Sequence, residues 1–282
     1  MKKPTKRAVC LTIAIAGMIV LFAYEVLGLE GKLLSWLDES SRYLVSMTVT
    51  RLIGGAIFLS MVINLGYRVL DPIKKPFWRS VLICLPAFAV AINNFPFSRL
   101  ISGGAVIDSP AWKIALLAME CLCVAFFEEM AFRGVVLLGL IGRRAKDRLW
   151  VFVSVVLSSV IFGLIHLINL YNSDPIAVIL QIGYSTLIGA MCSVVLIKTA
   201  NIWLCVALHG VFNFGGAVVQ YCGRGEIWDT FTVILTAIIA VATTVYMIFA
   251  FLRADLSVFD GVYGIKAANN DKEIDSREGY AL

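Results

Sequence analysis

Residues 127–134 read Phe-Glu-Glu-Met-Ala-Phe-Arg-Gly, which places two adjacent carboxylates and an arginine inside an apolar stretch that extends from 111 to 141. Apart from this cluster, the only charged residues in 111–141 are Lys113 and Glu120. The stretch therefore predicts a membrane-spanning helix. Each ionisable side chain at the centre of a bilayer costs at least ~2.5 kcal/mol, so such a cluster indicates a function or a specific pairing.

The spacing within the cluster separates the two glutamates. Glu129 and Arg133 are four residues apart and share a helix face, whereas Glu128 points about 100° away. We therefore predict that Glu129 and Arg133 form a structural ion pair that supports the site. Glu128 has no local partner, and an unpaired buried acid without a task would be an uncompensated cost, which favours a functional role for it.

The composition predicts an all-α polytopic membrane protein. The chain has 282 residues, of which 60% are hydrophobic and 15% charged, outside the range of ordinary soluble domains. The seven cysteines form no C-x-x-C pair and are interpreted as small packing residues, not as a disulfide or zinc framework. The sequence has no nucleic-acid signature, so the predicted partners are the lipid bilayer and a peptide or membrane-protein substrate.

Eight apolar runs are long enough to predict transmembrane helices. We expect one transmembrane domain over 1–252 and a flexible cytoplasmic tail over 253–282. The third span contains Pro86 and is expected to be short or kinked. The predicted spans lie at about 8–29, 50–67, 80–97, 111–141, 150–170, 176–197, 201–220 and 229–252.

The basic residues give the expected orientation, because cytoplasmic loops hold an excess of Lys and Arg. With eight spans, fourteen basic residues fall on the side of the termini and six on the other, without counting the tail. Both termini are therefore expected in the cytoplasm, and we expect the protein in a bacterial cell membrane.

The chain holds only two histidines, and both lie in apolar spans. His166 follows Phe162 by four residues, and His209 precedes Asn213 by four, so each pair shares a helix face. Counting ~1.5 Å of rise per residue from the cytoplasmic end of each span brings Glu128, His166, His209 and Asn213 near the midplane. Such a set could activate a water and bind an oxyanion, or could ligate a metal.

These residues resemble the CPBP family of intramembrane proteases, also called the Abi or CAAX protease-like family. The family pattern is Glu-Glu-x-x-x-Arg, then Phe-x-x-x-His, then His-x-x-x-Asn or Asp on separate helices. All three motifs are present, as Glu128-Glu129-Met-Ala-Phe-Arg133, Phe162-Gly-Leu-Ile-His166 and His209-Gly-Val-Phe-Asn213. The resemblance covers a catalytic core of about 111–220 and implies the eight-helix fold of the CAAX enzyme.

The resemblance implies an intramembrane endopeptidase in which Glu128 and His166 activate the attacking water. His209 and Asn213 would stabilise the oxyanion, and Glu129, Arg133 and Phe162 would support the site. No cofactor is predicted. If a divalent metal such as zinc were bound, Glu128, His166 and His209 would be its ligands.

Two other functions are weighed against this one. The first is a non-enzymatic bacteriocin-immunity or peptide-binding membrane protein, and the second is a proton-coupled transporter. Against the transporter, the sequence shows no internal repeat.

Four other polar residues within apolar spans have a structural or a functional interpretation. Glu25 and Glu120 are expected to be structural. Gln181 and Asn169 could line the same cavity as the histidines, although spacing alone does not decide it.

Overall fold

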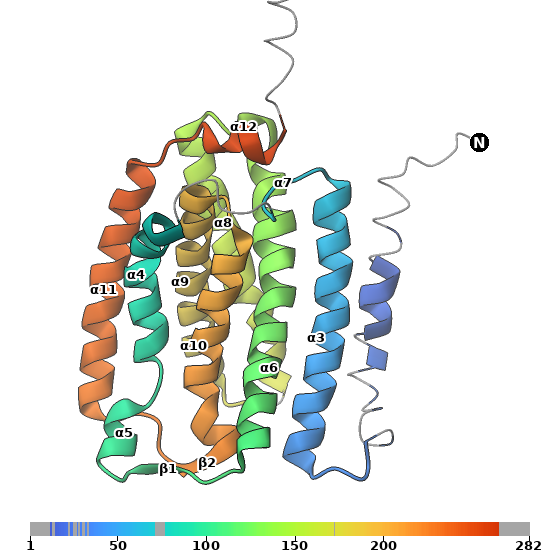
Figure 1. The fold of residues 1–282 in the computed structure, drawn as a ribbon, viewed down its shortest axis with the longest axis vertical. Helices are drawn as coiled ribbons and strands as arrows, with labels where there is room; N and C mark the ends of the chain where they lie inside the picture. Colours follow the sequence, from blue (N-terminus) through green and yellow to red (C-terminus); the bar gives the residue numbers. More distant parts are fainter. Residues whose placement is uncertain are drawn as a thin grey trace, which may run out of the picture.

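The protein is a bundle of long helices in this computed structural model, which describes residues 12, 15–21, 23–24, 27, 29, 32, 34–70, 77–171 and 173–264 (Figure 1). The prediction of an all-α polytopic membrane fold is confirmed. Five helical runs in the described part of the chain are long and apolar enough to cross a membrane, namely Glu39–Asn64, Arg148–Tyr171, Pro175–Thr199, Ile202–Cys222 and Thr230–Leu252. The count of eight spans stays a prediction, because ten of the 22 residues of the first predicted span, Glu25 among them, lie outside the described residues.

In the described part of the chain the bundle consists of seven longer helices, with seven shorter elements between them. The larger ones are α3 (Glu39–Asn64), α4 (Phe77–Asn93), α6 (Ala111–Glu129), α8 (Arg148–Leu164), α9 (Pro175–Thr199), α10 (Ile202–Cys222) and α11 (Thr230–Leu252). The shorter ones are α5 (Phe97–Ile101), a π-helix (Met130–Leu137), α7 (Leu138–Ile141), two 3-10 helices (Gly142–Arg144 and Ile165–Tyr171) and two strands, β1 (Ala105–Ile107) and β2 (Gly223–Gly225).

Short polar residues mark where most of these helices begin. The side chain of the N-cap residue accepts a hydrogen bond from a backbone N–H in the first turn, which the helix itself leaves unpaired. Such caps begin α3, α8, α9, α10 and α11, and the residues are Asp38, Asp147, Asp174, Asn201 and Asp229. Asp229 also accepts from the Ser98 hydroxyl at 2.6 Å, and these bonds lower its pKa to about 2.

The second predicted span starts earlier than expected. Helix α3 begins at Glu39, and not near residue 50, because Asp38 caps it and its first turns tolerate polar residues. The hydroxyls of Thr48 and Thr50 donate to the carbonyls of Leu44 and Ser46, four residues earlier, so these side chains are satisfied within the helix. Mean hydropathy alone does not detect such a segment.

A two-stranded antiparallel ribbon, which the sequence did not predict, joins two loops at one end of the bundle. Ala105 pairs with Gly225, and Ile107 pairs with Gly223. Gly223 is required here, because a Cβ at this position would collide with the carbonyl oxygen of Val106. We call this end, which also carries α5, the ribbon end (Figure 1).

The other end is closed by a short helix, α12 (Val258–Val262), whose Phe259 and Val262 are buried. The prediction of a flexible tail from residue 253 is therefore wrong for 253–264, since Phe259 supplies an apolar anchor. Residues 265–282 lie outside the described part. The Lys146–Asp260 ion pair at 2.7 Å holds the loop after α7 against α12. We call this end the basic end, because Arg143, Arg144 and Lys146 lie in that loop.

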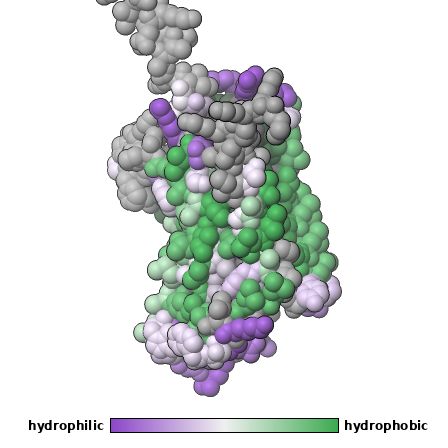
Figure 2. All heavy atoms as spheres, turned by 90° about the vertical axis from the view of Figure 1, so that its right-hand side faces the viewer, coloured by the Kyte–Doolittle hydropathy of each residue, from purple (hydrophilic) through white to green (hydrophobic). Residues whose placement is uncertain are grey.

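The outer surface fits a lipid environment. Figure 2 shows an apolar band between hydrophilic ends on the face that it presents. Large apolar side chains are also exposed along α11, among them Ile238 and Val241 at 61% and 66%. Apolar surface of this extent indicates contact with hydrocarbon.

We predict that the basic end faces the cytoplasm. Arg144 and Arg224 are exposed at the basic end and the ribbon end, with 58% and 76% of their side chains accessible, and the six described cysteines are buried. In intact cells, a membrane-impermeant maleimide should label Arg224→Cys, and should label Arg144→Cys only after permeabilisation. The unsubstituted chain is the control, and the reverse pattern would overturn the orientation.

Candidate active site

The two adjacent glutamates lie where α6 passes into the π-helix. The side chain of Glu129 is completely buried, whereas that of Glu128 is 19% exposed and lines a cavity. The two side chains thus occupy different faces, as the spacing predicts. A π-helix widens the turn and is common at functional sites, and here it carries Arg133.

Glu129 is the centre of a buried charge network. Its Oε1 lies 3.0 Å from Nη1 of Arg133 and 2.8 Å from Nδ1 of His209. The Arg133 guanidinium carbon also lies 4.6 Å from the centre of the Phe162 ring, within the range of a cation–π contact. The predicted pairing of Glu129 with Arg133 is present, and His209 joins it as a partner that helix spacing could not reveal.

Glu128 also faces His209, so it is not without an ionisable neighbour. Its Oε2 lies 3.4 Å from the Nε2 of the imidazole. An ionised Glu129 can only accept, so Nδ1 of His209 carries a proton. A bare Nε2 would then direct its lone pair at Glu128. A proton on Nε2 or on Glu128, or a cation between them, removes that conflict.

His166 lies at the start of the 3-10 helix that follows α8. Its Nδ1 lies 3.0 Å from the carbonyl oxygen of Phe162 and is the donor of that hydrogen bond, which leaves Nε2 as the acceptor of a neutral ring. The Phe162 ring is nearly perpendicular to both imidazoles, at centroid distances of 5.3 Å from His166 and 5.7 Å from His209. Phe162 therefore packs between the two histidines and Arg133.

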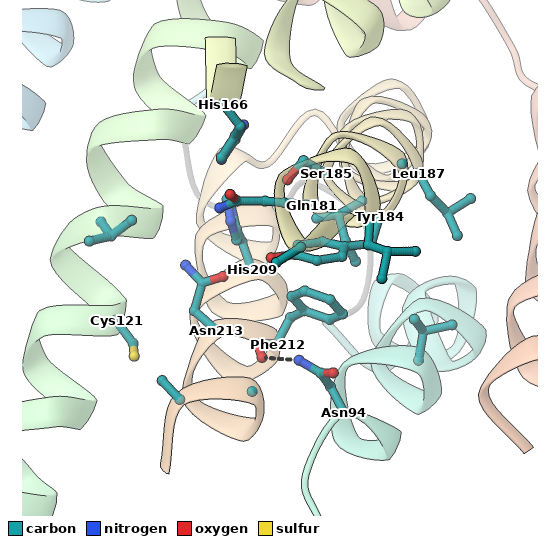
Figure 3. Close-up of a pocket in the computed structure, with 18 of the residues that line it drawn as sticks. Asn94, Cys121, His166, Gln181, Tyr184, Ser185, Leu187, His209, Phe212 and Asn213 are labelled. Atoms are coloured by element: carbon teal, nitrogen blue, oxygen red, sulfur yellow. Dashed lines mark hydrogen bonds between the residues drawn. The ribbon is translucent and has the colours of Figure 1, made fainter. Parts of the chain in front are cut away.

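A single cavity of about 1080 Å³ is lined by all four predicted functional residues, Glu128, His166, His209 and Asn213. His209 and Asn213 come from successive turns of α10, and His166 points toward them from the neighbouring segment (Figure 3). In the described part of the chain no hydrogen bond or ion pair joins His166 to Glu128, and the cavity that both residues line can admit a substrate or water between them.

Gln181 and Tyr184 of α9 add polar groups to this cavity. Nδ2 of Asn169 donates to Oε1 of Gln181 at 2.8 Å, which directs the Gln181 amino group away from that bond. In Figure 3 the Gln181 amide and the Tyr184 hydroxyl both point toward His209 and Asn213. Gln181 is the one side-chain amide of its predicted span, which was its only signal in the sequence, and Tyr184 gave none.

The three predicted metal ligands do not come together as one group. Glu128 and His209 are 3.4 Å apart, close to the ~3.3 Å that separates two ligands of tetrahedral zinc. Among the described residues, the potential ligands that lie within 4.8 Å of one another are instead Glu129, Cys192 and Cys205. Arg133 and His209 already compensate Glu129, and the Cys205 thiol lies 3.2 Å from the Cys192 carbonyl oxygen, so this group is explained by packing.

The fold and the site define a class of protein: a polytopic membrane protein with carboxylates and imidazoles converging on an intramembrane cavity. Residues 110–215 match a family described as Rce1-like, type II CAAX prenyl endopeptidase Rce1-like. This segment contains every residue of the three motifs. The match over this segment supports the CPBP, or CAAX protease-like, family, whose members of this type are membrane-embedded endopeptidases. Searches of curated proteins and of solved structures gave no significant match.

We predict that Glu129→Gln lowers stability, because it leaves Arg133 with an uncompensated buried charge. Removing one partner of a buried pair costs ~3 to 5 kcal/mol. The double variant Glu129→Gln with Arg133→Met should recover part of that loss, although in both variants the acceptor for Nδ1 of His209 becomes a neutral amide oxygen. Thermal unfolding in lipid nanodiscs measures this, and a double variant less stable than Glu129→Gln would contradict it.

Proposed function

We propose that this endopeptidase cleaves a peptide or membrane-associated protein with a water activated by Glu128 and His166. The observation that carries the proposal is the shared cavity, into which a partly exposed carboxylate and an imidazole project from different helices. The proposed roles of Glu129, Arg133 and Phe162 are to hold this arrangement.

Glu128 suits the role of general base. In the proposed step its carboxylate takes a proton from water while the water oxygen attacks the peptide carbonyl carbon. The C–N bond then breaks as the same proton passes to the leaving amine, so no other reactant is required. The acceptor Nε2 of His166 would orient the water, because the Phe162 carbonyl occupies the other ring nitrogen.

His209 suits the binding of negative charge. Both of its nitrogens face carboxylates, which favours an imidazole that donates from both positions. Such an imidazole is suited to stabilising a developing oxyanion and not to accepting a proton. Asn213, one turn further along α10, would supply a second donor from its amide.

The test of the base is Glu128→Gln, which keeps the size and hydrogen-bonding capacity of the side chain. We predict that cleavage falls by about 10²- to 10⁴-fold, the usual contribution of a general base, while thermal stability stays near that of the wild type. Comparative peptidomics of cells with the wild type or the variant would reveal products that depend on Glu128.

Glu226→Gln is the matched control, because Glu226 is exposed at the ribbon end and lies outside the cavity. Identical peptide profiles for wild type and Glu128→Gln would contradict the mechanism. An immunity or binding phenotype that survives Glu128→Gln would instead favour the non-enzymatic alternative.

We also predict cleavage without a tightly bound metal. The family motifs place an amide, Asn213, beside His209. An amide is better suited to binding an oxyanion than to ligating zinc. Metal content of the purified protein and cleavage in the presence of a chelator measure this. Chelator-sensitive cleavage that one equivalent of zinc restores would contradict this prediction.

A further inference from the structure

The charged side chains of the cavity wall are predominantly acidic. Among the described residues that line the cavity, the charged side chains other than the two histidines are Glu120 and Glu128, and none is a lysine or an arginine. Most of the remaining wall is apolar and comes from α9, α10 and α11, for example Leu180, Phe212 and Val233. A bound segment therefore meets hydrocarbon and carboxylates.

Glu120 lies on the same helix as Glu128, two turns nearer to the ribbon end. Glu120, Val124 and Glu128 form one stripe of α6 along the cavity. Eight residues at ~1.5 Å of rise separate the two glutamates by about 12 Å. Asn94, Gln220 and Tyr221 also line the cavity and come from segments near the ribbon end.

Glu120 forms no close ion pair in the described part of the chain, and Arg51 of the neighbouring α3 attracts it only from a longer distance. The ion pairs found there within 4.0 Å do not include it. Arg51, from the neighbouring α3, stacks on the Phe127 ring at 5.2 Å from its centre. A half-buried carboxylate that projects into a largely apolar cavity without a paired cation gains when a ligand brings one.

We propose that Glu120 is a substrate-recognition residue that binds a lysine, an arginine or an amino group of the peptide to be cleaved. This inference depends on the proposed function of the cavity. An extended peptide advances ~3.3 Å per residue, so a distance of about 12 Å places the cationic residue three or four positions from the scissile bond. The rest of the bound segment is apolar, and a free carboxylate within it would face two like charges.

The inference is tested with synthetic twelve-residue Ala/Leu peptides, capped at both ends. Each carries one lysine at successive positions, and a matched set carries norleucine, which keeps the length without the charge. Binding to the Glu128→Gln protein in nanodiscs measures recognition without turnover. Cleavage by the wild type, followed by mass spectrometry, locates the scissile bond.

We expect lysine peptides to bind about tenfold more tightly than norleucine peptides, the effect of one charge-assisted hydrogen bond. Cleavage should fall three or four residues from the lysine. Adding Glu120→Gln should abolish the preference, and adding Glu120→Lys should transfer it to peptides with glutamate. Adding Glu226→Gln should leave it unchanged, and thermal unfolding verifies that each variant is folded.

The outcomes separate the two proposals. Equal binding of lysine and norleucine peptides, or a preference that persists in Glu120→Gln, overturns the role of Glu120. Cleavage without a lysine preference overturns that role alone. A lysine preference that depends on Glu120, without any cleavage by the wild type, supports the cation site and contradicts the endopeptidase proposal for these peptides.

Discussion

The buried contact of Glu129 with Arg133 and His209 is the constraint on which the site depends. Two opposite charges within an apolar bundle are tolerated only when they remain together, because each alone would carry the full cost of desolvation. Since His209 comes from α10, this contact also fixes α10 against α6. The packing around it leaves little freedom, since a Cβ on Gly189 would lie 3.1 Å from Nη2 of Arg133 and 3.2 Å from the Phe162 ring.

This constraint explains why the helices and the composition of the site are evident in the sequence. Charged residues are rare in apolar spans, so Glu128, Glu129 and Arg133 stand out, and the interval of four residues joins the last two. The two histidines stand out for the same reason. Helix positions follow from the length of the apolar runs, with the exception of α3, whose early polar residues hide its first turns.

Other features depend on contacts between distant segments, which spacing cannot reveal. His209 contacts both glutamates because its imidazole has two nitrogens on opposite sides of the ring. From the sequence alone, the rotation of about 100° between adjacent helix residues predicts only that Glu128 and Glu129 lie on different faces. The amino-acid composition of Met130–Leu137 does not distinguish this π-helix from an α-helix. The ribbon forms from two segments of only three residues each, and α12 from five residues beyond the last apolar run.

The closure of the basic end by α12 has a consequence for biosynthesis. The backbone N–H of Arg68 donates to the carbonyl of Val262, and the Tyr263 hydroxyl donates to the carbonyl of Leu138 at 2.7 Å. These bonds join early and middle segments to residues that leave the ribosome much later. Because synthesis proceeds from the N-terminus, the helices must insert and associate before this end can close. Premature termination before residue 258 would therefore release a bundle whose basic end stays unsealed, even though its motifs are complete.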